Sequence, residues 1–171
     1  ERLRGLEVIV SVFVLGVHFE VEEVVVEVEQ HETQAAPLQA LADLGAEVIR
    51  IDPPAGPRWK DPAFDMLSRG KRALTVDLKT EAGRDTAYDL VRRADVVIEN
   101  FRPGVVEKWG LGPDSFKQSN PGLVYARISG YGQDGPYSSK PGFASVCEGM
   151  SGFRYVNGHP GEAPVRPNLS I

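Results

Sequence analysis

The chain alternates between short apolar runs and stretches in which apolar residues recur every three or four positions, and the alternation is regular from Gln34 onward. Runs rich in β-branched residues predict strands, because such side chains pack well on a pleated sheet. Apolar residues at helical spacing predict helices. We therefore expect strands over residues 46–51, 73–78, 95–99 and 123–128, and helical segments over residues 81–93, 105–109 and 113–118.

Capping and turn-forming residues mark where two of the helices begin or end. A helix after Gln34 is expected to stop at Gly45, because glycine readily adopts the left-handed conformation that closes a helix. Thr80 is a natural cap for the helix over residues 81–93. The inward-facing residues are expected to be Leu38, Leu41, Ala42 and Leu44 in the first helix, and Ala87, Leu90 and Val91 in the second. The proline-rich residues 53–63 are expected to be a loop.

Strands that alternate with helices at these intervals indicate an α/β fold, with a Rossmann-like, mostly parallel sheet flanked by helices. The wholly apolar run Val96–Ile98 is typical of a strand that is buried on both faces of such a sheet. Ligands of these sheets bind beyond the carboxyl ends of the strands. The loops that follow the predicted strands are therefore the first place to look for a functional site.

The first 32 residues differ from the rest of the chain. They contain eight Glu and two Arg, a net charge of −6, whereas the remainder has a net charge of +1 and all thirteen prolines. Residues 7–15 are rich in β-branched side chains and predict a strand, while Phe19–Glu22 and Val26–Glu29 alternate as a half-exposed strand would. We therefore divide the chain into an atypical Val/Glu-rich strand segment over 1–32 and an α/β domain over 33–171.

Composition narrows the class of protein. With 171 residues, 42% of them hydrophobic and 25% charged, the chain has the size and balance of one globular domain. A net charge of −5 argues against a general nucleic-acid binder, and no apolar run approaches the roughly 20 residues that cross a bilayer. One cysteine and three scattered histidines predict a reducing cytoplasm and no zinc site.

Two loops at predicted strand ends have unusual compositions. Residues 99–104 include Asn100 and Phe101, which could offer an amide and a stacking face to a planar ring such as adenine. The alternative is a polar loop whose Phe packs in the core. Residues 129–137 are dense in glycine and aromatics, which permits close backbone approach to a ligand but equally forms structural turns.

A third candidate is a group of cations around one predicted strand. Arg69, Lys71, Arg72 and Lys79 could form a phosphate site or simply a solvated surface. The glycine fingerprint of a nicotinamide cofactor follows neither residues 8–15 nor residues 46–51, which disfavours a nicotinamide-dependent oxidoreductase. The chain also lacks the glycine-rich phosphate loop and the Gly-x-Ser-x-Gly nucleophile turn.

Taken together, these segments resemble the class III CoA-transferases, typified by formyl-CoA and carnitine CoA-transferases. The resemblance runs from about residue 34 to the end, with motifs in the family's order and spacing. They include Gly-Lys-Arg-Ala-Leu-Thr-Val-Asp-Leu-Lys and Ala-Asp-Val-Val-Ile-Glu-Asn-Phe-Arg-Pro-Gly. The matching segments are residues 41–52, 70–79, 94–104, 110–112, 120–125, 129–137, 141–143 and 164–171.

The resemblance implies an enzyme that moves coenzyme A from an acyl-CoA to a small carboxylic acid, with no metal, as a homodimer when full length. In the family an aspartate forms an anhydride and then a thioester, which is nucleophilic catalysis by a carboxylate. Carried over by position, the residues along the adenosine part of CoA are Val76, Asp77, Leu78, Lys79, Asn100, Phe101 and Arg102. Lys108 and Lys140 take the places of basic residues near the phosphates, and Gln34 that of an active-site glutamine.

The chain departs from the family pattern in ways that bear on activity. The nucleophilic aspartate would fall two positions after Ile171, so we expect an amino-terminal part that holds the CoA site without the nucleophile. A racemase relative would carry His-Asp where Phe143 and Ala144 stand, which favours the transferase branch. A non-catalytic CoA- or nucleotide-binding fragment remains the alternative. No partner among membranes or nucleic acids is expected.

Overall fold

The structure, a computed structural model, describes residues 24–28, 32–56 and 62–165. Its centre is a five-stranded sheet with the spatial order β3-β2-β1-β4-β5, in which every neighbouring pair is parallel. The strands are β1 (Val24–Val28), β2 (Glu47–Asp52), β3 (Arg72–Thr75), β4 (Val96–Glu99) and β5 (Val124–Arg127). The predicted α/β fold with a Rossmann-like parallel sheet is confirmed.

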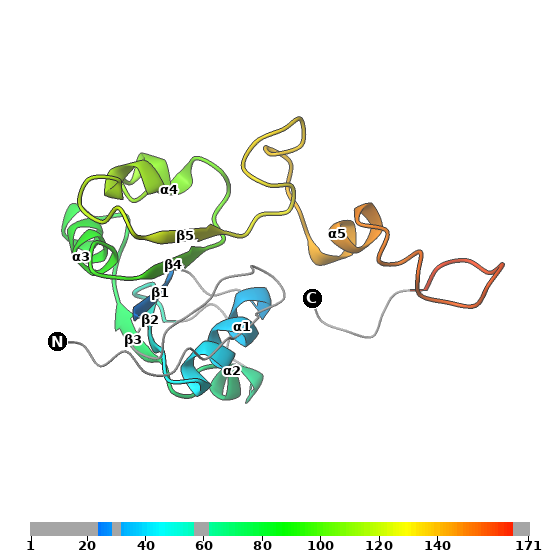
Figure 1. The fold of residues 1–171 in the computed structure, drawn as a ribbon, viewed down its shortest axis with the longest axis horizontal. Helices are drawn as coiled ribbons and strands as arrows, with labels where there is room; N and C mark the ends of the chain where they lie inside the picture. The colour runs from blue at the N-terminus through cyan, green and yellow to red at the C-terminus, as the bar shows by residue number, and fades with distance from the viewer. Residues whose placement is uncertain (1–23, 29–31, 57–61, 166–171) are drawn as a thin grey trace.

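Helices cover both faces of this sheet (Figure 1). On one face α1 (Glu32–Asp43) buries Leu38 and Leu41 against side chains of β1, β2 and β4, and α2 (Pro62–Leu67) lies beside α1. The other face carries α3 (Glu81–Val91), α4 (Val105–Lys108) and the 3₁₀ turn η1 (Pro113–Phe116). Two hydrophobic clusters, one on each face, therefore hold the three layers together.

Both predicted helix boundaries are confirmed by their hydrogen bonds. At the end of α1, the Ala46 N–H donates to the Leu41 carbonyl and the Gly45 N–H to the Ala42 carbonyl, each at 3.1 Å. Gly45 has φ +102°, so the helix closes in a Schellman motif. At the start of α3, the Gly83 N–H donates to Thr80 Oγ1 at 3.1 Å, which makes Thr80 the cap.

Three predictions of local structure are wrong. Val26–Val28 is not half-exposed, because β1 is the middle strand of the sheet and is covered by helices on both faces. Leu44 is 43% exposed, since it lies past the last turn of α1. The expected loop over 53–63 ends early, because α2 begins at Pro62, a residue well suited to a first helical turn. The strand predicted over residues 7–15 lies outside the described residues.

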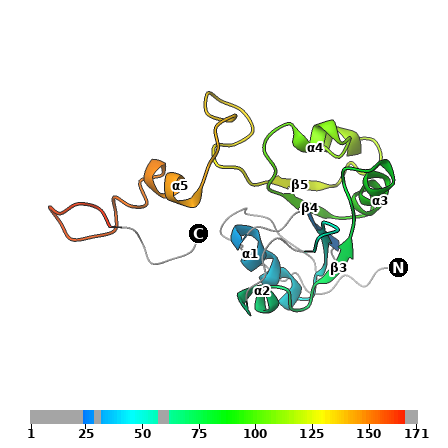
Figure 2. The same ribbon diagram turned by 180° about the vertical axis from the view of Figure 1, so that it is seen from behind.

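The chain leaves the sheet after β5 and continues through α5 (Ala144–Met150) and a series of turns to residue 165. Figures 1 and 2 show this segment extending away from the layered body in both views. We call residues 143–165 the arm. Several of its large apolar side chains are exposed, among them Phe143 (68%), Met150 (62%), Tyr155 (83%) and Val156 (75%). These side chains find no core within the part of the chain that the structure describes.

Candidate functional site

The sheet has its topological switch point between β1 and β4, because the chain runs from β1 outward to β3 and then crosses to β4. Parallel α/β sheets bind ligands in the crevice at the carboxyl ends of the strands, near this point. The two predicted adenosine-contacting segments follow β3 and β4. Those strands are separated by β2 and β1, so three strand spacings, about 14 Å, lie between them. That distance suits an extended ligand that spans both loops.

The segment Val76–Lys79 is an ordered loop between β3 and α3. Its first residue extends the sheet, because the Val76 N–H donates to the Asp52 carbonyl at 2.9 Å. The Asp77 carboxylate accepts the Lys79 N–H at 3.0 Å, and the Asp77 carbonyl accepts the Thr80 hydroxyl at 2.8 Å. The helix cap and the loop are thus one hydrogen-bonded unit, which leaves the Lys79 side chain exposed at its surface.

The turn Asn100–Arg102 follows β4, and two contacts of Phe101 fix its position. The Phe101 N–H donates to Glu99 Oε2 at 2.6 Å. The Phe101 ring meets the Trp109 ring edge-on, with centroids 5.1 Å apart. Asn100 is half-buried and Arg102 exposed. Phe101 thus packs against the core, as the alternative interpretation of this loop had it, while Arg102 is exposed.

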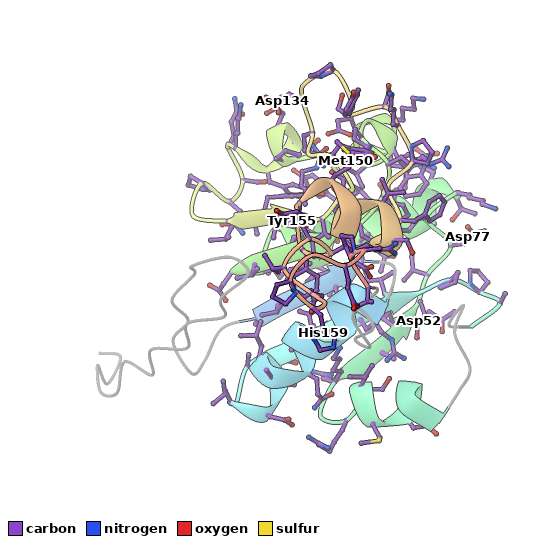
Figure 3. The ribbon with its side chains drawn as sticks, turned by 90° about the vertical axis from the view of Figure 1, so that its right-hand side faces the viewer. Asp52, Asp77, Asp134, Met150, Tyr155 and His159 are labelled. Carbon is purple, nitrogen blue, oxygen red and sulfur yellow. The ribbon has the colours of Figure 1, made fainter. Side chains whose placement is uncertain are left out.

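The two loops meet the same hydrophobic cluster. Leu78 from the first loop and Phe101 from the second both pack against the cluster formed by α3, α4 and the sheet. Figure 3 labels Asp52 and Asp77 where β2 and β3 end, and Asp134, Met150, Tyr155 and His159 in the segment that follows β5. The fold therefore brings Val76–Lys79 and Asn100–Arg102 to one edge and one face of the sheet.

Cations along this edge differ in whether they already have acidic partners. Lys79, Arg102 and Lys108 are exposed and form no ion pair within the described ranges. In the predicted basic cluster, by contrast, Arg69 pairs with Asp43, Lys71 with Glu27 and Arg72 with Glu47. Of the four cations in that cluster, Lys71 is buried in its pair, while Arg69 and Arg72 form exposed pairs, which favours the alternative of a surface without a phosphate for these three.

The remaining predicted site residues occupy other places. Lys108 ends α4, one turn beyond the loop after β4. Gln34 lies in the first turn of α1, and its side chain is outside the described part. Lys140 lies in the loop after β5, where its ammonium is 3.9 Å from the centre of the Tyr137 ring. Lys140 thus already has a cation–π partner within its own loop.

The glycine-rich loop after β5 uses its glycines for backbone geometry. Gly132 and Gly135 have φ of +82° and +90°, which only glycine adopts without strain. The backbones of Gly130 and Gly142 touch, so that a Cβ on either would collide with the other. The structural alternative therefore accounts for these residues: they close the loop on itself.

A buried ionic cluster that no pattern in the sequence indicated lies on the α1 face of the sheet. Glu27 Oε2 and Lys71 Nζ are 3.1 Å apart, and neither side chain is exposed. Beside them, Arg50 makes two hydrogen bonds to Asp52, at 2.8 and 2.9 Å. Burial raises the pKa of Glu27 and lowers the pKa of Lys71, while their mutual attraction opposes both shifts.

A second ionic network lies on the opposite face. Glu99 Oε1 accepts a hydrogen bond from Arg127 Nε at 2.8 Å, and Arg127 reaches Glu107 of α4 at 2.7 Å. Burial raises the pKa of Glu99, opposed by the bond from Arg127 and the Phe101 N–H. In sequence, Glu99 is simply the polar end of an apolar run. Only the pairing of β4 with β5 reveals its partner.

Among the described residues, no group of three or more His, Cys, Asp or Glu side chains could hold a metal ion. Over the same residues, no helix is both long enough and apolar enough to span a membrane.

The chain is similar in sequence to curated CoA-transferases. Over 144 residues the chain is 43% identical to a succinyl-CoA–D-citramalate CoA-transferase of Chloroflexus aurantiacus, covering 78% of this chain and 36% of the relative. It is 37% identical to a succinate–glutarate CoA-transferase of Agrobacterium fabrum, covering 78% of this chain and 38% of the relative. The chain thus spans about a third of the length of these curated relatives.

Solved structures agree. A CAIB/BAIF family protein from Brucella suis superposes with a TM-score of 0.79 at 36% identity, covering 87% of this chain and 43% of that one. Rv3272 from Mycobacterium tuberculosis superposes with a TM-score of 0.75 at 37% identity, covering 86% and 44%. The family model of CoA-transferase family III matches residues 23–171. The chain therefore belongs to CoA-transferase family III.

Proposed function

We propose that this chain holds the nucleotide end of coenzyme A, as part of an enzyme that transfers CoA from an acyl-CoA to a small carboxylic acid. The chain's own residues bind and orient the acyl-CoA substrate. In this proposal Val76–Lys79 and Asn100–Arg102 flank the adenosine. Lys79, Arg102 and Lys108 compensate the phosphate charges, because they are the exposed cations along this edge that form no ion pair within the described residues.

One observation carries the proposal. Leu78 and Phe101 come from loops 23 residues apart, yet both loops follow carboxyl ends of strands and both side chains pack against a single cluster on the α3–α4 face of the sheet. In each loop a nearby carboxylate accepts a backbone N–H, from Lys79 to Asp77 and from Phe101 to Glu99, and these bonds restrain the loop backbone. Preformed loops of this kind lower the entropy that ligand binding must overcome.

The names of the relatives support a proposal for the acid substrate. The names of the two curated relatives above include succinate or succinyl-CoA together with citramalate or glutarate, all of them dicarboxylic acids. We therefore infer a short dicarboxylic acid as the acceptor. By the resemblance, the aspartate that forms the anhydride stands two positions after Ile171, and Gln34 belongs to the same active site.

Calorimetric titration of the purified chain with CoA tests the proposal. We expect saturable binding that weakens when CoA lacks its 3′-phosphate, because a phosphate paired with Lys or Arg contributes charge-assisted hydrogen bonds. Lys79→Met should lower the affinity for CoA about tenfold, the loss of one such bond. Lys117→Met is the matched control. Lys117, directly after η1, is also exposed, but it already pairs with Asp114. A folded chain that does not bind CoA would refute the proposal.

We further propose that a second copy of the protein covers the arm, as the homodimer of the family implies. Sedimentation equilibrium should then show a monomer–dimer equilibrium, because exposed apolar patches of this kind mark interaction sites. Replacing both Tyr155 and Val156 with Ser should shift the equilibrium to monomer without lowering the melting temperature. Leu44→Ser is the control, since Leu44 is exposed on α1, outside the arm. A chain that stays monomeric at every concentration contradicts this assignment.

A further inference from the structure

We propose that Glu99 is a positioning residue for the CoA site, whose carboxylate holds the turn Asn100–Arg102 in its ligand-binding conformation. The inference rests on the proposed function above. It concerns a side chain that is 1% exposed and therefore touches no ligand itself. Glu99 acts through Phe101, whose backbone N–H it accepts.

The position of Glu99 in the fold allows its carboxylate to contact the turn after β4. It is the last residue of β4, next to the switch point, and its neighbour across the sheet is Val28 of β1. Its side chain points to the α3–α4 face, on which the turn after β4 also packs. Oε2 lies 2.6 Å from the Phe101 nitrogen, so the carboxylate bridges two residues forward and closes the turn.

The second oxygen ties the turn to the rest of the domain. Oε1 accepts Arg127 Nε from β5 at 2.8 Å, and Arg127 is held in turn by Glu107 of α4 at 2.7 Å. Both carboxylate oxygens of Glu99 thus accept hydrogen bonds, one from the turn and one from the Arg127 guanidinium. The turn cannot rotate about its backbone without breaking the short hydrogen bond to the buried Glu99 carboxylate.

The free-energy cost of burying the Glu99 carboxylate indicates that this side chain does more than fill the core. Val96, Val97 and Ile98, which precede Glu99 in β4, are all apolar and buried. A fourth apolar residue would satisfy packing without the desolvation of a charge, which is expensive unless the charge is paired and hydrogen-bonded. An apolar side chain, however, could not accept the Phe101 N–H.

Glu99→Gln tests the inference, because glutamine keeps the shape but offers one acceptor oxygen in place of two. If that oxygen stays with Arg127, the Phe101 N–H faces an amide donor. We expect CoA affinity to fall about tenfold. By nuclear magnetic resonance, the Phe101 amide should lose its protection from hydrogen exchange while the Ile98 amide within β4 keeps its own. A residue with only a packing role would not change these two amides differently.

Asp89→Asn is the matched control. It makes the same carboxylate-to-amide change in an arginine pair, with Arg92 at 2.7 Å, on the exposed side of α3. Both CoA affinity and Phe101 protection should stay at the wild-type values. Unchanged Phe101 protection in Glu99→Gln overturns the positioning role. Lost protection with unchanged CoA affinity also overturns it, and leaves the proposed function standing.

Lowering the pH provides a second test, in which the CoA affinity of the wild-type chain is compared with that of Glu99→Gln. The charged and titratable groups that face Glu99 are Arg127 and Tyr125 of β5 and Glu107 of α4. Acidification below the raised pKa of Glu99 removes its charge and one acceptor. CoA affinity in the wild type should therefore approach that of Glu99→Gln as pH falls, in a range where the chain stays folded. A difference that is constant with pH overturns the role of the carboxylate. If the wild type does not bind CoA, the proposed function fails first, and this inference with it.

Discussion

Replacing Lys71 with methionine is expected to lower the free energy of unfolding by about 3–5 kcal/mol. The variant leaves the Glu27 carboxylate in the middle of the sheet, where the side chain is 0% exposed and Glu27 Oε1 already has no hydrogen-bond partner among the described residues. An uncompensated buried charge is far more costly than the pair itself is stabilising. Urea denaturation, followed by circular dichroism, measures the change.

Two further variants separate the buried charge from other effects. Glu27→Leu combined with Lys71→Met should recover most of the lost stability, because an apolar pair needs no compensation. Arg69→Met removes a cation from an exposed pair with Asp43 and should cost at most about 1 kcal/mol. If Lys71→Met is as mild as Arg69→Met, the ion pair does not lie in a dry interior.

The pH dependence of the Lys71→Met defect has a defined sign. Burial raises the folded-state pKa of Glu27 above the ordinary 4.5, so protonation favours the folded chain. The stability associated with this group is present below pH 4.5 and is lost as pH rises through the folded pKa. Lys71→Met removes the main attraction that opposes the shift. The defect should therefore be larger at pH 8 than at pH 5.

Gly83→Ala should lower both stability and CoA affinity. A Cβ at this position would press on the carbonyl oxygen of Asp77 and lie 2.7 Å from its carbonyl carbon. Because these are backbone atoms, the loop Val76–Lys79 or α3 must move. Overpacking of this kind costs about 1–3 kcal/mol, more than the gain of about 1 kcal/mol from the higher helix propensity of alanine. Thermal unfolding and CoA titration would measure the two effects.

Gly149→Ala is the control for this prediction. Gly149 is also inside a helix, α5, but a Cβ there meets nothing within 4 Å. This variant should be as stable as the wild type or up to about 1 kcal/mol more stable. Equal stability of the Gly83→Ala and wild-type chains would mean that the first turn of α3 does not press on the loop. Such a result would also weaken the conclusion that the loop Val76–Lys79 and the Thr80 cap of α3 form one unit.

The strands that the sequence predicted best are those whose own composition decides their burial. Val96–Ile98 is apolar throughout, and β4 is buried on both faces as expected. For β1, the alternation of Val and Glu led to the wrong prediction of a half-exposed strand, because the same pattern is typical of a strand with one solvent-exposed face. Glu27 is buried because Lys71, 44 residues later in the chain, supplies the opposite charge. No local pattern contains that information.

The candidate site divides in the same way. Thr80 and Gly45 were predictable because a cap and a helix end depend on neighbours within a few residues. The basic cluster was not, because whether Arg69 or Arg72 is available to a ligand depends on carboxylates from α1 and β2. The predicted contacts of Val76–Lys79 and Asn100–Arg102 with CoA, and the division at residue 32, stay predictions.

The class of fold, most of the strand and helix positions and, through the motifs, the family could be predicted from the sequence. These depend on periodicity and on short segments, which can be recognised one at a time. The tertiary structure alone decided the strand order, the partners of the buried charges and the position of the two loops on one face. The reason is physical: the side chains of Glu27 and Glu99 are stabilised by groups that only the folded sheet brings within hydrogen-bonding distance.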